Sequence, residues 1–383
     1  MVPEQWEIKC LADLASKISD GIHTTPIYAN QSNIYFINGN NLKNGSILIQ
    51  KSTKFVDEKD AIKHRRDIGE RTLLMSINGT IGNLAYYRGE NVVLGKSACY
   101  INVKENVDLD FIYYVLEDTK TQAFYESELT GTTIRNLSLK SIKATKVITP
   151  PLSEQQKISK ILLTWDQAIL ATEKLIENIQ QQKKALMQHL LTGKKRLLDE
   201  NGVIFQEKWS EVLLGHIAKI TTGSSNRQDS TLSGKYAFFD RSEDIRTSDM
   251  YLFDCEAVIV PGEGQDFVPK YFVGKFDLHQ RTYAIMDFPK CDGKFLFYII
   301  DYFRAYFLSQ AVGSTVKSLR LPMFQKMKLV VPCLGEQKKI AKVLTIADQE
   351  IETLQKKLDC LKQEKKALMQ QLLTGKKRVK VAA

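Results

Sequence analysis

The most regular feature of the chain is a narrow apolar seam that occurs twice. Apolar residues recur at alternating intervals of four and three positions from Ile158 to Leu190, and again from Ile340 to Leu372. This spacing is typical of a coiled-coil helix, which presents one narrow apolar stripe to a partner. Each stretch predicts a helix of about 37 residues, which would be about 55 Å long at 1.5 Å per residue.

The two seams favour packing of one helix on the other. Each apolar stripe is interrupted at few positions, by Thr172 and Lys183 in the first helix and by Lys365 in the second. Because a whole domain connects the helices, the chain can return and place them antiparallel. The alternative is that each helix packs on its own domain, but a small domain would leave much of so long a seam uncovered.

Both helices belong to an internal repeat with an offset of 182 residues. The segment 183–196 recurs at 365–378, and the motif at 150–155 is matched at 332–337. Nearly half of the positions between Gly131 and Arg196 are identical to their partners. The chain therefore contains two copies of one unit.

The remaining sequence forms two globular blocks that share landmarks and differ elsewhere. The landmarks are a starting tryptophan, an apolar run that ends in a glycine turn, and a later Gly-Lys pair. They are Trp6, Leu73–Gly82 and Gly95-Lys96 in the first block, and Trp209, Val258–Gly264 and Gly274-Lys275 in the second. We predict an α+β protein with two mixed α/β domains, two long helices packed as an antiparallel coiled coil, and pseudo-twofold symmetry. The expected boundaries are domain 1 at 1–149, a helical region at 150–197, a linker at 198–208, domain 2 at 209–331 and a second helical region at 332–383.

Composition narrows the class of protein. The formal charge is +10, from 54 Lys and Arg against 44 Asp and Glu, which favours a polyanionic partner, most commonly nucleic acid. A basic protein with an ordinary solvated surface would have the same balance. The six cysteines show no metal-ligand or redox spacing, and no apolar run has transmembrane length. We therefore expect a cytoplasmic protein with reduced cysteines and no membrane partner.

No catalytic signature stands out. Gly95-Lys96-Ser97 resembles part of a P-loop, but Gly89 lies one residue too far upstream and a strand-like run follows. The five histidines are scattered, and no dinucleotide fingerprint or methylase motif occurs. We expect no catalytic residue and no metal site, and hence a chain that is not itself an enzyme.

The motifs at Pro150–Gln156 and Leu190–Lys194, repeated around two variable domains, resemble the specificity subunits of type I restriction-modification systems. The resemblance covers the whole chain; Cys333 and Gly335 depart from the first copy. It implies that each domain reads one half of a split, asymmetric DNA target and that the helices set the spacer. It also implies two modification subunits, which methylate adenine N6 with S-adenosylmethionine, and restriction subunits, which use ATP and magnesium. No cofactor is expected in this chain.

Contacts to double-stranded DNA require Arg and Lys for phosphates, and Arg, Lys, Asn and Gln for base edges. The candidates in domain 1 are Thr24, Arg65, Arg66, Asn78, Thr80, Lys96 and Arg135. Those in domain 2 are Asn226, Arg227, Arg241, Gln265, Lys270, Arg281, Lys317 and Arg320. For any one of them, a solvated surface side chain is the alternative. Arg135 and Lys317 occupy matching loops, so phosphate contact or scaffolding suits them better than base reading.

Polar residues repeated on the two helices predict two equal docking faces for the modification subunits. They are Glu154, Gln155, Asp166, Glu336, Gln337 and Asp348. The basic run 194–196 and its copy are interpreted as solvated helix ends, which favour cations, and contact with DNA is the alternative. Two other functions stay open, a specificity subunit of a methylation-only system and a coiled-coil adaptor that binds proteins.

Overall fold

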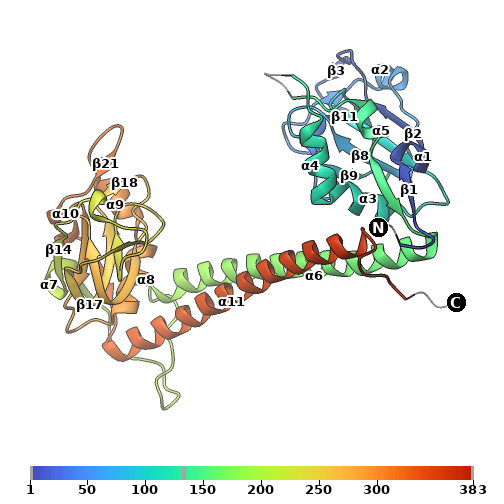
Figure 1. Ribbon diagram of the computed structural model, residues 1–383. Helices are drawn as coiled ribbons and strands as arrows, with labels where there is room; N and C mark the ends of the chain where they lie inside the picture. The colour runs from blue at the N-terminus through green and yellow to red at the C-terminus, as the bar shows by residue number, and fades with distance from the viewer. Residues whose placement is uncertain (1–2, 132–134, 381–383) are drawn as a thin grey trace. The chain divides into compact units, whose positions relative to one another are not determined.

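The computed structural model describes residues 3–131 and 135–380 and divides into two compact units. Unit 1 comprises Met1–Thr172 and Lys357–Ala383, and unit 2 comprises Glu173–Lys356. Each unit contains one globular domain together with one end of each long helix (Figure 1).

Two helices of equal length, α6 and α11, carry the apolar seams. α6 spans Leu152–Leu190 and α11 spans Leu334–Leu372, with 39 residues in each. Both end shortly before a glycine in the left-handed region, Gly193 with φ 69° and Gly375 with φ 72°. Glycine is favoured there because a Cβ would be strained in that conformation. The predicted long helices and their glycine stops are confirmed.

The helices run antiparallel within each unit. In unit 1, Ile158 and Leu162 near the start of α6 share a core with Leu372 near the end of α11. In unit 2, Leu190 near the end of α6 shares a core with Ile340 near the start of α11. The start of each helix meets the end of the other, so the predicted antiparallel packing is confirmed.

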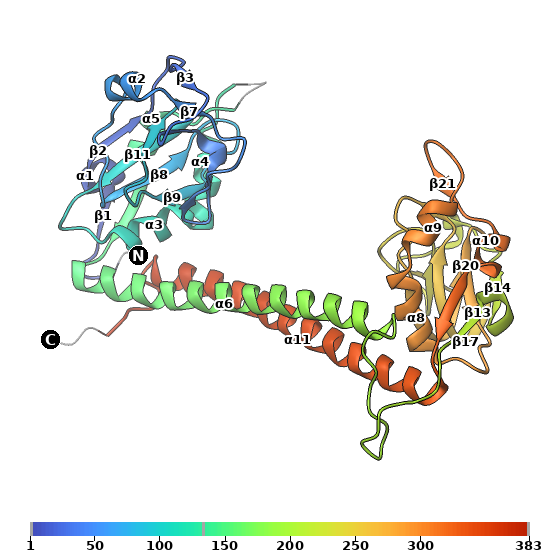
Figure 2. The ribbon, with the colours of Figure 1, turned by 180° about the vertical axis from the view of Figure 1, so that it is seen from behind.

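Domain 1 is built on an antiparallel sheet with the strand order β2-β11-β8-β9, and a second sheet has the order β10-β4-β7-β3. Helices α3 and α4 lie beside the first sheet (Figure 2), where Phe111 of α3 packs with Leu73 and Ile101. Strands β1 and β12 pair antiparallel, which places the start of the domain beside the strand that precedes α6. The elements are β1 (Glu7–Cys10), α1 (Leu11–Leu14), β2 (Ala15–Asp20), β3 (Tyr28–Ala29), β4 (Tyr35–Ile37), η1 (Gly39–Asn41), β5 (Leu42–Lys43), β6 (Ser46–Ile47), β7 (Phe55–Val56), α2 (Glu58–Lys63), β8 (Thr72–Ser76), β9 (Leu84–Tyr86), β10 (Val92–Leu94), β11 (Ala98–Val103), α3 (Leu109–Glu117), α4 (Thr119–Ser127), α5 (Leu139–Lys143) and β12 (Lys146–Thr149).

Domain 2 repeats this frame in one larger sheet with the order β14-β20-β17-β19-β15-β16. Helix α8 covers it, with Phe295 packed against Val258 and Ile285. Strands β13 and β22 pair as β1 and β12 do. The elements are β13 (Ser210–Leu213), α7 (Leu214–Ile217), β14 (Lys219–Thr222), η2 (Arg227–Asp229), β15 (Tyr236–Phe239), β16 (Arg246–Ser248), β17 (Phe253–Pro261), β18 (Glu263–Gly264), β19 (Lys270–Leu278), β20 (Thr282–Met286), α8 (Gly293–Tyr302), α9 (Ala305–Gln310), β21 (Lys317–Ser318), α10 (Leu321–Gln325) and β22 (Lys328–Val331).

Matching glycines mark equivalent strand ends in the two domains. A Cβ on Gly21 would lie 2.0 Å from the carbonyl oxygen of Leu94, and one on Gly223 would lie 1.7 Å from that of Leu278. Any other residue would have to displace this backbone, so both positions require glycine. Because the matching glycines contact these two carbonyls, Leu94 of domain 1 is structurally equivalent to Leu278 of domain 2.

The turns that follow these leucines are therefore equivalent. Residues 95–97 connect β10 to β11, and residues 279–281 connect β19 to β20. The predicted match of Gly95-Lys96 with Gly274-Lys275 is wrong, because Gly274 and Lys275 lie inside β19 and pair with β17. A two-residue match cannot distinguish a turn from a strand.

Lysines at the weak positions of the seam make equivalent contacts in the two units. In unit 1, the Lys365 ammonium lies 2.6 Å from Asp166 on α6 and 2.9 Å from Glu117 on α3. The hydroxyl of Tyr114 donates to the second Asp166 oxygen at 2.6 Å. Burial by itself lowers the pKa of Lys365, but Glu117 and Asp166 outweigh it and raise the pKa above its ordinary value. This network links both long helices to domain 1.

The same network recurs in unit 2. Lys183 on α6 lies 2.5 Å from Asp348 on α11, and the hydroxyl of Tyr298 on α8 donates to Asp348 at 2.6 Å. Burial, followed by the bond to Asp348, raises the pKa of the Tyr298 phenol. A polar residue in an apolar seam penalises alternative alignments of the two helices, in which it would lose its polar partner. We therefore interpret Lys183 and Lys365 as residues that fix the alignment of α6 with α11.

The repeated glutamines at the starts of the long helices bind the domains. Gln155 accepts the Asp108 backbone N–H at 2.9 Å and donates to the Pro150 carbonyl at 2.8 Å. Gln337 accepts the Asp292 N–H at 2.9 Å. Asp108 and Asp292 are the N-caps of α3 and α8, so each glutamine joins a long helix to a domain helix.

The neighbouring glutamates bind the basic runs that follow the long helices. Glu336 is fully buried and accepts from Nε and Nη2 of Arg196 at 2.8 and 2.7 Å, and from Nε1 of Trp209 at 3.2 Å. Glu154 pairs with Arg378 in the same way in unit 1. The two arginines are therefore bound within the chain, which corrects their interpretation as solvated helix ends.

The predicted docking faces need correction because most of their side chains are buried. Four of the six are 4% exposed or less. They are Glu154, Gln155, Glu336 and Gln337. The other two, Asp166 and Asp348, are partly exposed, but each is held by a lysine and a tyrosine. The identical repetition reflects an intramolecular contact that is made twice.

The connection between α6 and domain 2 is a small structured loop. Leu198 and Ile204 form an isolated antiparallel bridge, and the Asp199 N–H donates to the Val203 carbonyl at 2.7 Å. The Asp199 carboxylate accepts the N–H of Val203, which lowers the pKa of that carboxyl. The expected linker at 198–208 thus contains a turn that its own hydrogen bonds hold.

Candidate nucleic-acid interface

A hollow of about 270 Å³ lies at one end of the domain 2 sheet. Its side chains come from η2, from the segment after β15, from β18 and from the turn between β19 and β20. They are Arg227, Asp240, Arg241, Glu263, His279, Gln280 and Arg281. The strand order brings together residues that lie up to 54 positions apart in the sequence, from Arg227 to Arg281. The result is a cationic hollow that also contains two carboxylates.

Glu263 organises two of the arginines. It forms an ion pair with Arg281, and Arg241 lies 3.9 Å from its other oxygen. The Glu263 side chain is 17% exposed, whereas those of Arg241 and Arg281 are 56% and 62% exposed. The carboxylate is therefore recessed, and the guanidinium groups extend toward solvent.

The floor of the hollow contains an acceptor that is only partly satisfied. Asp240 is buried, and its Oδ1 accepts the Ser242 N–H at 2.7 Å. Its Oδ2 has no hydrogen-bond partner among the described residues; the nearest cation is Nε of Arg227, at 3.8 Å. Burying a carboxylate oxygen without a donor costs free energy. A ligand that supplied a donor would recover part of it.

The turn between β19 and β20 is held in place by its own side chains. Nδ1 of His279 accepts the Arg281 N–H at 3.1 Å, and Gln280 donates to the Asn226 side chain at 2.6 Å. Burial lowers the pKa of His279, although the nearby Asp240 opposes this. Because Nδ1 accepts the Arg281 N–H, the neutral imidazole carries its proton on Nε2.

Domain 1 has a larger hollow, about 670 Å³, at the equivalent strand ends. Its lining combines apolar side chains with amides and hydroxyls, and also includes a lysine and a histidine–aspartate pair. The lining residues are Asp20, His23, Asn38, Ile77, Asn78, Gly79, Lys96, Ser97, Asn136, Leu137, Ser138 and Leu139. Ser97 donates to Asn38 at 2.9 Å, and His23 contacts Asp20 at 2.7 Å. Among the described residues, no arginine lines this hollow.

Two of the predicted DNA-binding residues of domain 1 line this hollow, and two others are sequence neighbours of lining residues. Asn78 and Lys96 line it, and Thr24 and Thr80 each adjoin a lining residue, His23 or Gly79. The carbonyl of Arg135 accepts the Gly79 N–H at 3.3 Å, and its side chain lies 3.3 Å from Glu126. The loop residues Thr132, Thr133 and Ile134, which suggested the Arg135 prediction, lie outside the described residues.

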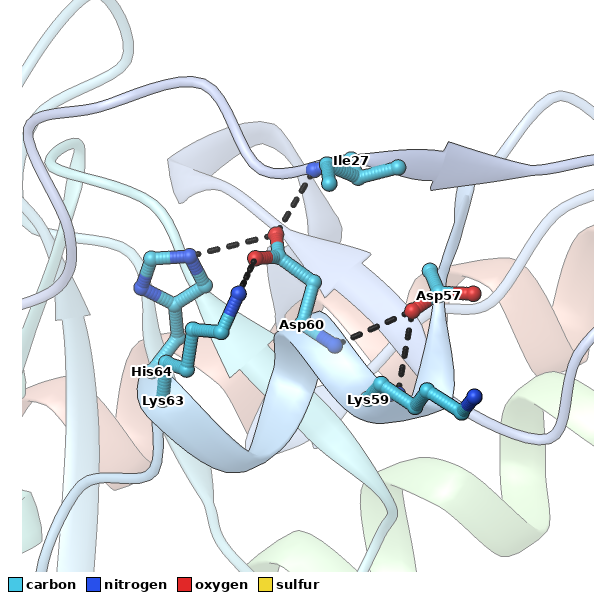
Figure 3. A network of polar contacts seen from close by, with 6 residues as sticks. All are labelled: Ile27, Asp57, Lys59, Asp60, Lys63 and His64. Carbon is cyan, nitrogen blue, oxygen red and sulfur yellow. Dashed lines mark hydrogen bonds and ion pairs between the residues drawn. The ribbon is translucent and has the colours of Figure 1, made fainter.

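The basic run at 63–66 is partly structural (Figure 3). Asp60 in α2 accepts the Ile27 N–H at 2.8 Å and lies 3.3 Å from both Lys63 and His64. The Ile27 hydrogen bond, helped by Lys63 and His64, lowers the pKa of the Asp60 carboxyl. This run therefore fixes α2 to the preceding loop.

The two arginines of that run differ in position. Arg66 donates to the Gly21 carbonyl at 3.1 Å, so it is linked to the strand end beside the hollow. Arg65 is exposed. Both positions are compatible with phosphate contact, which stays a prediction.

In domain 2, three predicted residues line the hollow, namely Arg227, Arg241 and Arg281, and Asn226 supports the Gln280 side chain. Lys270 donates to the Ser242 carbonyl, and burial lowers its pKa. It positions the loop after β15 and is poorly placed for a phosphate.

A second group lies beside the hollow on the ribbon of β18 and β21. Gly264 pairs with Lys317, and the Leu319 N–H donates to the Gly262 carbonyl at 2.8 Å. Gln265 and Arg320 directly follow these paired residues and are exposed. The ribbon therefore extends the basic surface away from the hollow.

Sequence reasoning missed the acidic and uncharged side chains of the hollows. Asp240, Glu263 and His279 lie beside predicted arginines, and Asn38 and Ser97 occupy the positions equivalent to Asp240 and Arg281. Aligning the turns after Leu94 and Leu278 would have found these equivalences. Single carboxylates and amides in loops carry no periodic signal.

The architecture matches solved structures of S subunits. The type I restriction-modification system S subunit from M. genitalium aligns over 97% of this chain and 98% of its own, with a TM-score of 0.65 and 17% identity. A chain from a structure on complex assembly and conformational transition of the type I R-M system aligns over 98% and 99%, with a TM-score of 0.57 and 13% identity. At these identities the likeness concerns the fold. The chain therefore shares the fold of these structures.

Sequence comparison gives the family. The model of the type I restriction modification DNA specificity domain matches residues 3–181 and again 206–363, so the chain belongs to this family. It is 26% identical to the type I restriction enzyme MjaVIII specificity subunit of Methanocaldococcus jannaschii over 99% of the chain and 94% of that protein. It is also 28% identical to the EcoDI specificity subunit of Escherichia coli over 43% of the chain and 37% of that protein. The DNA-recognition role follows from the family.

Specificity subunits of this family are non-catalytic. Within residues 3–131 and 135–380, no cluster of three or more His, Cys, Asp or Glu side chains is placed to hold a metal ion. Among the same residues, no helix has both the length and the apolar character required to cross a membrane.

Proposed function

We propose that the chain directs a type I restriction-modification complex in the cytoplasm to a bipartite, asymmetric DNA target. Each domain reads one half-site, and the two long helices set the spacer between them. The observation that carries the proposal is the pair of hollows, which lie at equivalent strand ends of a repeated frame but have different linings. A frame used twice with two different surfaces suits a target with two different halves.

The surrounding charge suits a DNA backbone. The chain has a formal charge of +10, and both domains carry exposed basic residues, among them Arg65 in domain 1 and Lys317 in domain 2. Phosphate contacts of this kind position a protein on the duplex, whereas the side chains within the hollows face the base edges.

Two modification subunits bind this chain in the proposal, and restriction subunits join them. Because the repeated glutamates and glutamines are buried, the docking faces are proposed to include the exposed apolar residues Leu152 and Leu334. They occupy the same position in the two copies and are 38% and 40% exposed. S-adenosylmethionine, ATP and magnesium are used by the partner subunits.

Methylome sequencing tests the proposal. Cells that express the modification subunit with this chain are compared with cells that express the modification subunit alone. We expect adenine methylation at a split, asymmetric motif that disappears without the chain. If the complex assembles and no methylation depends on the chain, the proposal is wrong.

Two alternatives give different results. A protein-binding adaptor would show no steep salt dependence of DNA affinity, whereas phosphate contacts release counterions, so affinity falls strongly between about 50 and 200 mM salt. A methylation-only system would methylate the motif and leave unmodified DNA uncut when every subunit encoded nearby is supplied.

A further inference from the structure

We propose that the hollow of domain 2 reads a guanine through Arg241 and Arg281, with Glu263 as their positioning residue, and that domain 1 reads an A·T pair at the equivalent place. The inference rests on the proposed function and assigns a base class to each half-site. It follows from the chemistry of the side chains at matched positions in the two hollows.

The arginines of domain 2 have the geometry that a guanine contact requires. Each uses one terminal nitrogen, Nη1, toward the shared carboxylate of Glu263. A guanidinium has five N–H donors, so each arginine keeps a pair of donors for another acceptor. In the major groove guanine presents two adjacent acceptors, O6 and N7, which arginine binds in bidentate fashion.

Glu263 makes these side chains more selective. A free arginine loses rotamer freedom when it binds, and an ion pair with a recessed carboxylate removes part of that freedom in advance. The recessed Glu263 carboxylate also compensates part of the positive charge of the two arginines. Selectivity then depends mainly on the directions in which their remaining N–H groups point, and less on their charge. Glu263 itself lies in the short strand β18, which pairs with β21 and is thereby fixed to the frame.

A second, independent observation is the buried oxygen Oδ2 of Asp240, which lacks a hydrogen-bond donor among the described residues. The cytosine partner of guanine presents its N4 amino group as a donor in the major groove. A hollow with arginine donors and an unsatisfied carboxylate acceptor therefore matches the acceptor and donor pattern of a G·C pair.

The equivalent positions of domain 1 carry different chemistry. Asn38 stands where domain 2 has Asp240, and Ser97 stands where it has Arg281. Asn78 and Asn136 contribute two further amides to the lining. Asparagine pairs with the N6 and N7 atoms of adenine, and serine accepts either base pair, so this lining favours A·T.

The test is methylome sequencing of the full complex with three variants of domain 2. Arg281→Gln removes the fork and offers an amide, Arg281→Lys retains the charge without the fork, and Glu263→Gln releases both arginines. The matched control is Lys328→Gln, which removes one positive charge from the exposed β13–β22 ribbon of the same unit. Asn78→Ala in domain 1 identifies the half-site that belongs to each domain.

For the wild type we expect a guanine, on one strand, in the half-site that the Arg281 variants alter. Both Arg281 variants should reduce discrimination at one base pair by roughly 5- to 150-fold, the range for one bidentate contact. Glu263→Gln should relax the same half-site less strongly. The other half-site should be unchanged in all three, which also shows that the variants fold and assemble.

Three results would overturn the inference. They are a half-site of domain 2 without a G·C pair, an unchanged motif in both Arg281 variants, and an equal relaxation in Lys328→Gln. If the wild-type chain directs no methylation at all, the proposed function fails and the inference fails with it. If it directs methylation at a split motif and any of the three results is found, only the base assignment fails.

Discussion

Replacing Glu336 with alanine should destabilise unit 2 more than the matching replacement of Glu154 destabilises unit 1. Glu336 is fully buried and accepts three hydrogen bonds, two from Arg196 and one from the indole of Trp209. In unit 1, Nε1 of Trp6 is buried without a hydrogen-bond partner among the described residues, so Glu154 accepts no bond from this indole. The two positions are the same motif residue in two different surroundings.

The magnitude follows from what the substitution leaves behind. Removing one partner of a buried ion pair costs about 3–5 kcal/mol, because the other charge stays without compensation. The Arg196 side chain is 24% exposed and keeps its bond to the Glu207 carbonyl, so water can replace part of the loss. We therefore expect about 2–4 kcal/mol for Glu336→Ala. The Arg378 side chain is 41% exposed, so the loss in unit 1 should be smaller.

Hydrogen exchange measured by mass spectrometry on the intact chain reports the two units separately. In Glu336→Ala, peptides from domain 2 and from the start of α11 should lose protection, while those of domain 1 should not. Glu154→Ala should give the opposite pattern with a smaller change. Equal losses in the two variants, or a loss below about 1 kcal/mol in Glu336→Ala, would refute the assignment of Glu336 as a buried ion-pair acceptor.

Three further predictions follow from the described contacts. Gly21→Ala should destabilise domain 1 by about 2 kcal/mol or more in urea unfolding, since the new Cβ would meet the Leu94 carbonyl. The control Gly69→Ala adds a Cβ in open space and should have little effect. Comparable losses of unfolding free energy in the two variants would contradict the close approach of Gly21 to Leu94. Because the pKa of Lys365 is raised in the folded state, its contribution to stability is complete below the unfolded pKa and is lost as the pH rises through the folded pKa. Lys365→Met should therefore flatten the alkaline limb of a profile of unfolding free energy against pH. An unchanged alkaline limb would count against the network of Lys365 with Glu117 and Asp166. Because the pKa of Asp60 is lowered in the folded state, its contribution to stability is present above the unfolded pKa and is lost as the pH falls through the folded pKa. Amide exchange in α2 should therefore rise on acidification in the wild type and much less in Asp60→Asn. An equal pH dependence in the two proteins would exclude the Asp60 carboxylate as the cause.

The predicted docking faces were wrong for a physical reason. Glu154 and Gln155 recur unchanged in the second copy, and identical polar residues on a helix suggest a surface with an external partner. They are buried because each copy uses them to bind an arginine and a domain helix within the same chain. Repetition shows that a contact is made twice, but it does not reveal whether the partner is another chain.

Periodicity and repetition along the chain were enough to predict the two-copy organisation, the two long helices and their glycine stops, and they favoured the antiparallel packing. These features depend on local periodicity, on the conformational freedom of glycine and on an offset of 182 residues, all of which can be read along one dimension. The tertiary structure alone decided which polar side chains meet. The hollow of domain 2 draws residues from η2, the segment after β15, β18 and the turn before β20, and the strand order that gathers them results from non-local pairing. Arg281 could be chosen as a basic residue from the sequence, but it meets Glu263 only because β18, which directly follows β17, and the turn between β19 and β20 lie close together in the folded domain.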